Sequence, residues 1–164
     1  MKLKREYFKS FVFGVEDSLV STVGLLSGVA LAGVASSTVI LTGIVLIFVE
    51  AFSMAAGEFL SEYETEEYQH QGTVSPRTSL TASGIMFASY LISGLIPLSP
   101  YLFFPTSYDA LPYSIGASLV SLFCLGLIGA HITKTSYIRH AIRMLCVGGA
   151  AILVGILAGQ LVGY

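Results

Sequence analysis

The sequence predicts an all-α membrane protein in which five transmembrane helices form a single domain over residues 1–164. Charged residues make up only 11% of the chain, against about a quarter in a typical soluble domain. Hydrophobic residues make up 54%, and the mean hydropathy is +0.80. A bilayer core of about 30 Å takes about 20 helical residues to cross, and five apolar stretches of the chain are long enough to do so.

Short polar or proline-containing segments separate these stretches. We expect spans at residues 11–35, 38–60, 79–98, 114–133 and 142–162. Ser36-Ser37 is expected to form the first turn, and Pro97 and Pro100 to end the third span. The second span runs on into the acidic stretch SEYETEEYQHQ, which should project from the bilayer as a helix until Gly72 and Pro76 end it. The segment PYLFFPTSYDALPY is predicted to be an interfacial loop.

The basic residues predict the orientation. All eight lie in the N-terminal tail, in the connection after the second span, or around the connection after the fourth span. The other two connections carry no Lys or Arg. Because basic residues gather on the cytoplasmic side, we expect a cytoplasmic N-terminus, a cytoplasmic acidic extension of the second helix, and an external C-terminus.

Glycines recur at intervals of four in the first and fifth spans, at Gly24 and Gly28 and at Gly155, Gly159 and Gly163. Such positions let helix backbones approach closely in lipid. Two interpretations stay open, which are packing inside one bundle and a seam between two chains. Since five helices make a thin bundle, we expect a homodimer with a shared pathway.

Several functions are excluded by what the sequence lacks. It has no P-loop, GxSxG, HExxH or Rossmann motif, so we predict neither an enzyme nor a permanently bound cofactor. It has no basic stripe of the kind that binds nucleic acid. Cys124 and Cys146 lie in apolar runs without CxxC spacing, and we interpret them as small buried hydrophobic residues.

The candidate metal ligands lie on the first two spans. Glu50, Met54 and Glu58 are four residues apart, so a helix places them on one stripe. A carboxylate at the bilayer centre costs about 2.5–3.5 kcal/mol on insertion scales and often marks an ion or proton path. A protonated, hydrogen-bonded Glu50 is the structural alternative. Asp17 and the adjacent Glu16 lie in the first span, where they either face the interior or serve as helix N-terminal charges.

Weaker candidates follow on the acidic extension, where Glu62 and Glu66 would concentrate cations at the entrance or simply form a solvated helix face. Oxygen ligands suit hard ions, whereas the thioether of Met54 favours transition metals. The mixture points to Fe²⁺ or Mn²⁺ rather than Ca²⁺. The residue types alone do not distinguish Fe²⁺ from Mn²⁺.

The stretches FGVEDSLVSTVGLLSGVA and EAFSMAAGEFLSEYE resemble two motifs of the vacuolar iron transporter family. SGLIPLSPY resembles the family's third span and the following loop, so the resemblance covers nearly the whole chain. It implies a five-helix homodimer that exchanges Fe²⁺, and often Mn²⁺, for protons along a path at the dimer interface. The family's intramembrane aspartate falls on Asp17, its methionine on Met54 and its motif glutamate on Glu58.

The chain departs from the family pattern in places. Glu16 replaces an asparagine, Ser18 replaces a glycine, and Glu50 stands where a small residue is expected. Eukaryotic members carry a long helical metal-binding domain between the second and third spans. Only residues 61–78 stand there in this chain, which makes it a short form.

The leading hypothesis is a proton-coupled antiporter that moves Fe²⁺ or Mn²⁺ out of the cytoplasm. Its partners would be the bilayer, a second copy of the chain, divalent metal ions and protons. The alternatives are a passive dimeric channel for divalent cations and a membrane assembly protein that transports nothing. We expect the plasma membrane in a prokaryote and a vacuole-like organelle in a eukaryote.

Overall fold

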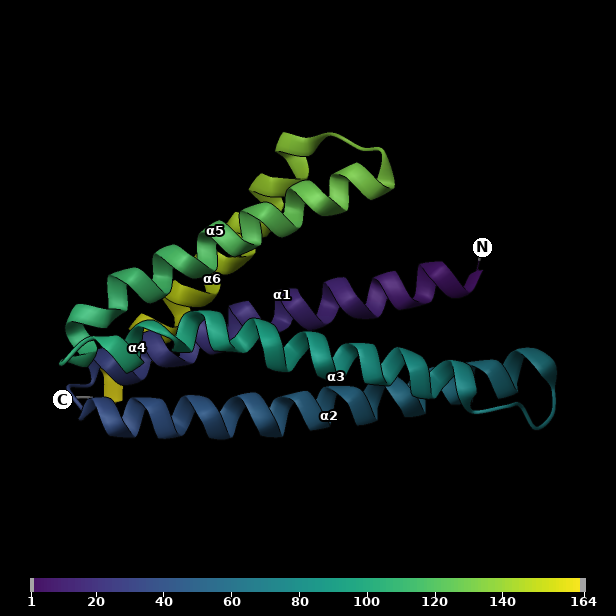
Figure 1. The fold of residues 1–164 in the computed structure, drawn as a ribbon, viewed down its shortest axis with the longest axis horizontal. Coiled ribbons are helices and arrows are strands. Elements are labelled where there is room, and N and C mark those ends of the chain that lie inside the picture. The colour runs from purple at the N-terminus through teal and green to yellow at the C-terminus, as the bar shows by residue number, and fades with distance from the viewer. Residues whose placement is uncertain (1, 163–164) are drawn as a thin grey trace.

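The computed structural model describes residues 2–162, which contain six helices and no strand (Figure 1). The helices are α1 (Lys2–Leu31), α2 (Ser36–His70), α3 (Arg77–Leu98), α4 (Pro100–Phe103), α5 (Ser107–Thr133) and α6 (Tyr137–Val162). All but the short α4 are long and apolar enough to cross a membrane. The predicted fold class is therefore confirmed, and the protein is an integral multi-pass membrane protein.

The turn between α1 and α2 lies earlier than predicted. α1 ends at Leu31 rather than at residue 35, and Ser36 already belongs to α2. Gly33 has a φ of 74°, which glycine adopts without the steric cost that a Cβ would add. The chain therefore turns around Gly33, and the expectation of a turn at Ser36-Ser37 was wrong.

The connection between the third and fourth spans is more helical than predicted. It contains α4, and α5 begins at Ser107 rather than at residue 114. The Thr106 hydroxyl accepts a hydrogen bond of 3.1 Å from the Asp109 backbone N–H, which satisfies one of the free donors at the helix start. By contrast, α2 continues through the acidic extension to His70, as the sequence predicts.

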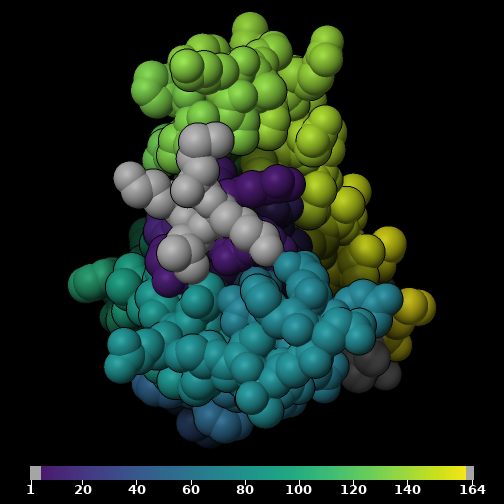
Figure 2. Space-filling model, turned by 90° about the vertical axis from the view of Figure 1, so that its right-hand side faces the viewer, coloured from purple at the N-terminus to yellow at the C-terminus, as the bar shows by residue number. Residues whose placement is uncertain are grey.

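α1 is the centre of the bundle, because it contacts each of the other four long helices. α2 and α3 lie side by side along α1, while α5 and α6 form a separate hairpin (Figure 1). We call the end that holds the start of α1, the α2–α3 connection and the α5–α6 connection the N-terminal end. The α5–α6 hairpin diverges from the other helices towards this end, where the first part of α1 lies between it and the α2–α3 connection (Figure 2).

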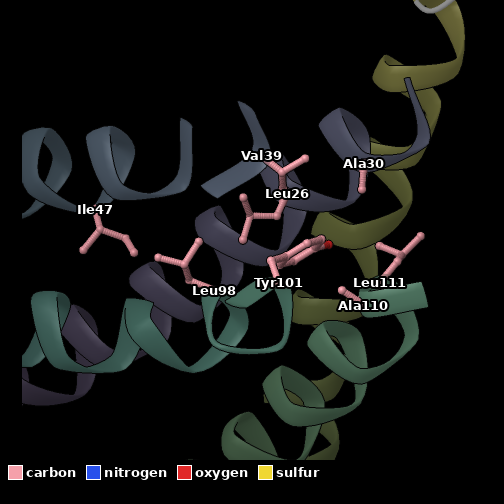
Figure 3. Close-up of a cluster of buried hydrophobic side chains, with 8 residues drawn as sticks. All are labelled: Leu26, Ala30, Val39, Ile47, Leu98, Tyr101, Ala110 and Leu111. Carbon is pink, nitrogen blue, oxygen red and sulfur yellow. The ribbon is translucent and has the colours of Figure 1, made fainter. Parts of the chain in front are cut away.

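At the opposite end the helices are joined by an apolar cluster (Figure 3). It contains Leu26, Ala30, Val39, Ile47, Leu98, Tyr101, Ala110 and Leu111. These residues come from α1, α2, α3, α4 and α5. A smaller cluster of Leu19, Leu122 and Met144 joins α1, α5 and α6 closer to the middle of the bundle. The two clusters fix α1 against its neighbours and so position the polar residues that α1 carries.

The glycines of α1 lie against those of α6. A methyl group on Gly28 would lie 2.5 Å from the Gly155 carbonyl oxygen, and one on Gly159 would overlap the Gly28 backbone. The two helix backbones are thus in direct contact, as small residues permit. Packing within one chain accounts for these glycines, while Gly163 lies outside the described residues.

Cys124 and Cys146 are free and exposed on the surface of α5 and α6. The interpretation of both as buried hydrophobic residues was wrong. An apolar surface of a membrane-spanning helix faces lipid, so an apolar sequence around a cysteine does not imply burial in protein.

Candidate carboxylate site between α1, α2 and α3

Tyr90 of α3 lies at the centre of the candidate site and has no exposed surface. Its hydroxyl oxygen lies 2.7 Å from the Ser21 Oγ of α1. One turn earlier on α1, the Ser18 hydroxyl donates a hydrogen bond of 2.7 Å to the Tyr90 carbonyl oxygen. Tyr90 is therefore held to α1 through both its side chain and its backbone.

Two carboxylates approach this tyrosine from different helices. Asp17 of α1 and Glu50 of α2 are both half-buried, and their charges act on each other and on the Tyr90 hydroxyl. Glu50 lies about 21 Å along the helix axis from Ser36, at 1.5 Å per residue. Asp17 and Glu50 thus lie within range of each other's charge in the membrane-spanning part of the bundle, on the consecutive helices α1 and α2.

Glu58 lies elsewhere on the stripe. The Ser10 hydroxyl donates a hydrogen bond of 2.6 Å to its Oε1 atom, and the Lys9 ammonium lies 3.9 Å from the same oxygen. Eight residues of helix separate Glu58 from Glu50, a rise of about 12 Å. Because a metal–oxygen bond is only about 2.0–2.6 Å long, these two carboxylates cannot bind one ion in this protomer. The stripe therefore divides into an inner pair, Asp17 with Glu50, and an outer position at Glu58.

Met54 lies between the two positions, one turn from each, and is half-buried. Across residues 2–162, no three His, Cys, Asp or Glu side chains converge where a metal ion could sit. A single protomer offers Asp17 and Glu50, with Met54 one turn further along α2. Hard divalent ions take about six ligands, so these groups alone do not complete a coordination shell.

The weaker candidates divide in the same way. Glu16 is half-buried next to the inner pair. Glu62 and Glu66 are half-buried on the projecting part of α2, and their charges interact with each other. The Nδ1 atom of His70 lies 2.9 Å from the Glu66 carbonyl oxygen. Glu62, Glu66 and His70 follow Glu58 along α2 and lie one or more turns closer to the N-terminal end.

Sequence reasoning missed the polar residues that join the helices around the carboxylates. Tyr90, Ser18 and Ser21 join α1 to α3, and Ser10 joins α1 to α2. The importance of Tyr90 could have been inferred from the spacing of the buried positions in α3. Its buried positions recur every three or four residues, as expected for one interior helix face. They are Ser79, Ala82, Ser83, Met86, Ser89, Tyr90, Ser93, Gly94, Pro97 and Leu98. A tyrosine on a face otherwise made largely of small side chains is a candidate for a specific polar contact.

The fold and the site define a multi-pass membrane protein with carboxylates held between its helices. The model of the VIT family matches residues 8–77 and 65–160, which together cover nearly the whole chain. This chain therefore belongs to the VIT family.

Relatives among known proteins cover most of the chain at low identity. "Vacuolar iron transporter homolog 2" of Arabidopsis thaliana is 27% identical over 172 residues, which cover 98% of this chain and 86% of the relative. "Vacuolar iron transporter homolog 3" of the same plant is 26% identical over 164 residues, covering 92% and 80%. "Vacuolar iron transporter 1" of Tulipa gesneriana is 22% identical, covering 87% and 82%.

Proposed function

We propose that this protein is a proton-coupled antiporter that moves Fe²⁺ or Mn²⁺ out of the cytoplasm. The observation that carries the proposal is the Asp17–Glu50 pair between the spans of a VIT-family chain. Ionisable residues inside a membrane mark ion and proton paths. The names of the relatives support iron as the cargo.

The pair supplies a simple coupling. Two neighbouring carboxylates repel each other, and either a proton or a divalent cation relieves that repulsion. A carboxylate must be deprotonated to bind a metal ion, so the two ligands compete for the same oxygens. Metal arriving from the cytoplasm displaces protons, and protons from the other side displace the metal. The Met54 thioether favours a transition metal over Ca²⁺.

A second copy of the chain would complete the site. The inner pair and Met54 give one protomer too few ligands, and two copies related by a two-fold axis would double the set. The exposed surface of α2 includes Val45, Val49 and Phe52 on turns next to the stripe. An apolar surface of this kind can pack against a second protomer as well as against lipid.

The orientation follows from the ends of the bundle. The segments that hold the Lys and Arg residues all lie at the N-terminal end (Figures 1 and 2). Because basic residues gather on the cytoplasmic side, this end faces the cytoplasm. Glu58 and the acidic extension of α2 then form the cytoplasmic entrance, and the inner pair lies deeper in the membrane.

Reconstituted vesicles test the transport reaction. With an acidic lumen and Fe²⁺ outside at neutral pH, we expect the protein to accumulate Fe²⁺ above the outside concentration while the lumen becomes more alkaline. Collapse of the pH gradient with a protonophore should stop accumulation, because the proton gradient is its energy source. The measurements are uptake of radioactive iron and the signal of a pH-sensitive dye in the lumen.

Two outcomes would contradict the proposal. Entry of Fe²⁺ that stops at equal concentrations and ignores the pH gradient would identify a passive channel, in which the same acids act as a selectivity filter. No uptake above protein-free vesicles would indicate a membrane protein that does not transport Fe²⁺. Repeating the assay with Mn²⁺ in competition determines the preferred ion.

Tyr90→Phe is expected to lower the rate of metal transport about tenfold, the lower end of what loss of a ligand-positioning partner costs. The change removes the hydroxyl that contacts Ser21 and lies in the field of both carboxylates. It keeps the ring and the backbone bond from Ser18, so the fold should survive. Tyr108→Phe, on a side chain that is 70% exposed, is the matched control. Equal rates for the two variants would show that the Tyr90 hydroxyl does not position the site.

A further inference from the structure

Lys9 forms an ion pair with a candidate metal ligand. Its ammonium lies 3.9 Å from the Glu58 Oε1 atom, and the two side chains are 64% and 11% exposed. The neighbouring Ser10 hydroxyl donates to the same oxygen. The Lys9–Glu58 pair is the only ion pair among the side chains of residues 5–161. One end of α1 thus supplies both a hydroxyl and an exposed ammonium to one carboxylate.

The surroundings of this pair are strongly acidic. The charges of Glu6, Glu58 and Glu66 all act on Glu62, and among the side chains of residues 5–161 Lys9 is the cation that acts on it with them. Lys9 therefore occupies the region to which the field of these carboxylates attracts a divalent cation.

We propose that Lys9 is a tethered competitor of the metal ion at the entrance and that a divalent cation must displace its ammonium from Glu58 to enter. This inference rests on the proposed transport function. Lysine carries a compact charge on a flexible four-carbon stem, and the exposure of Lys9 leaves its head free to move into solvent. Ser10 stays in place, because its hydrogen bond takes one lone pair of a carboxylate that has several.

The need to displace the Lys9 ammonium lowers the apparent affinity for the metal ion but has little effect on the rate of the transport step. While Lys9 pairs with Glu58, an arriving metal ion meets one partly neutralised carboxylate and one repelling charge. Lys9 therefore raises the metal concentration needed for half-maximal transport. The rate at saturating metal depends on the inner pair about 12 Å deeper, which Lys9 does not contact.

The test compares KM and kcat for Mn²⁺ in the vesicle assay. We expect Lys9→Gln to lower KM about threefold to fivefold, the scale of an exposed ion pair, with kcat unchanged. Lys9→Arg keeps the charge and should match the wild type. Lys134→Gln removes the same charge from the α5–α6 connection and serves as the matched control, for which we expect the wild-type KM.

A double-mutant comparison tests whether Lys9 changes KM through Glu58. In a Glu58→Gln background, adding Lys9→Gln should leave KM unchanged, because the pair is already broken. An unchanged KM in Lys9→Gln alone, with normal wild-type transport, overturns the role of Lys9 and leaves the proposed function standing. An equal fall in Lys134→Gln shows a general charge effect and also overturns it. Absence of transport by the wild type overturns both proposals.

Discussion

Replacing Asp17 by asparagine is expected to abolish proton-driven metal accumulation, with a fall in the initial rate of at least about 100-fold. The substitution keeps the size of the side chain and removes its charge. Loss of a partner that merely orients a metal ligand costs about 10–100-fold, so loss of a ligand itself should reach the upper end of that range. The amide that replaces the carboxylate also cannot take up and release a proton near neutral pH, so the coupling reaction fails together with metal binding.

The initial rate of iron uptake into vesicles with an acidic lumen measures this effect. Asp109→Asn is the matched control, because Asp109 is exposed, accepts a hydrogen bond from the Thr106 hydroxyl at 2.6 Å, and lies at the start of α5. It should transport at the wild-type rate. A wild-type rate in Asp17→Asn, with the protein correctly inserted, would remove Asp17 from the site and leave Glu50 as the only carboxylate of the inner pair.

Much of the fold could be predicted because a membrane limits what a chain can do. Each span must satisfy its own backbone hydrogen bonds, so a helix of sufficient length was the only solution for each apolar stretch. The projection of α2 to His70 followed from its unbroken run of helix-forming residues. Helix ends were less predictable, since a turn at Gly33 depends on a single backbone conformation.

The residues of the candidate site could be predicted in part, but their partners could not. Glu50 stood out because a carboxylate inside an apolar span is conspicuous, whereas Asp17 stood out through the resemblance to the family's motif. Their proximity depends on how α1 lies along α2, and no local pattern encodes that register. The division of the stripe likewise required the contact between Ser10 and Glu58. Helical spacing shows that residues share a face, whereas the neighbouring helix determines what each of them meets.

The glycines illustrate the same point, since the sequence left two explanations for them. In the structure a methyl group on Gly155 would overlap the Gly24 carbonyl group, with the Gly24 Cα atom at 3.1 Å. These atoms belong to a helix backbone and cannot rotate away as the tip of a side chain can. α1 and α6 would have to move apart, and the apolar contacts on both sides of the seam would loosen.

Gly155→Ala is therefore expected to destabilise the protein by about 1–3 kcal/mol, the usual cost of overpacking. For a chain of this size that is a fall in Tm of about 2–4 °C per kcal/mol, measured by thermal unfolding in detergent. Gly149→Ala is the control, because a methyl group on this other glycine of α6 meets nothing within 4 Å. Its Tm should stay at the wild-type value.

Size-exclusion chromatography with light scattering tests whether these glycines pack α1 against α6 within one chain. If they pack α1 against α6 within one chain, Gly155→Ala lowers Tm without changing the oligomeric state. If they form a seam between chains, Gly155→Ala dissociates the oligomer at low protein concentration while Tm of the separated chain stays close to that of Gly149→Ala. The contact between Gly28 and Gly155 favours the first result, because one pair of backbones cannot occupy both interfaces at once.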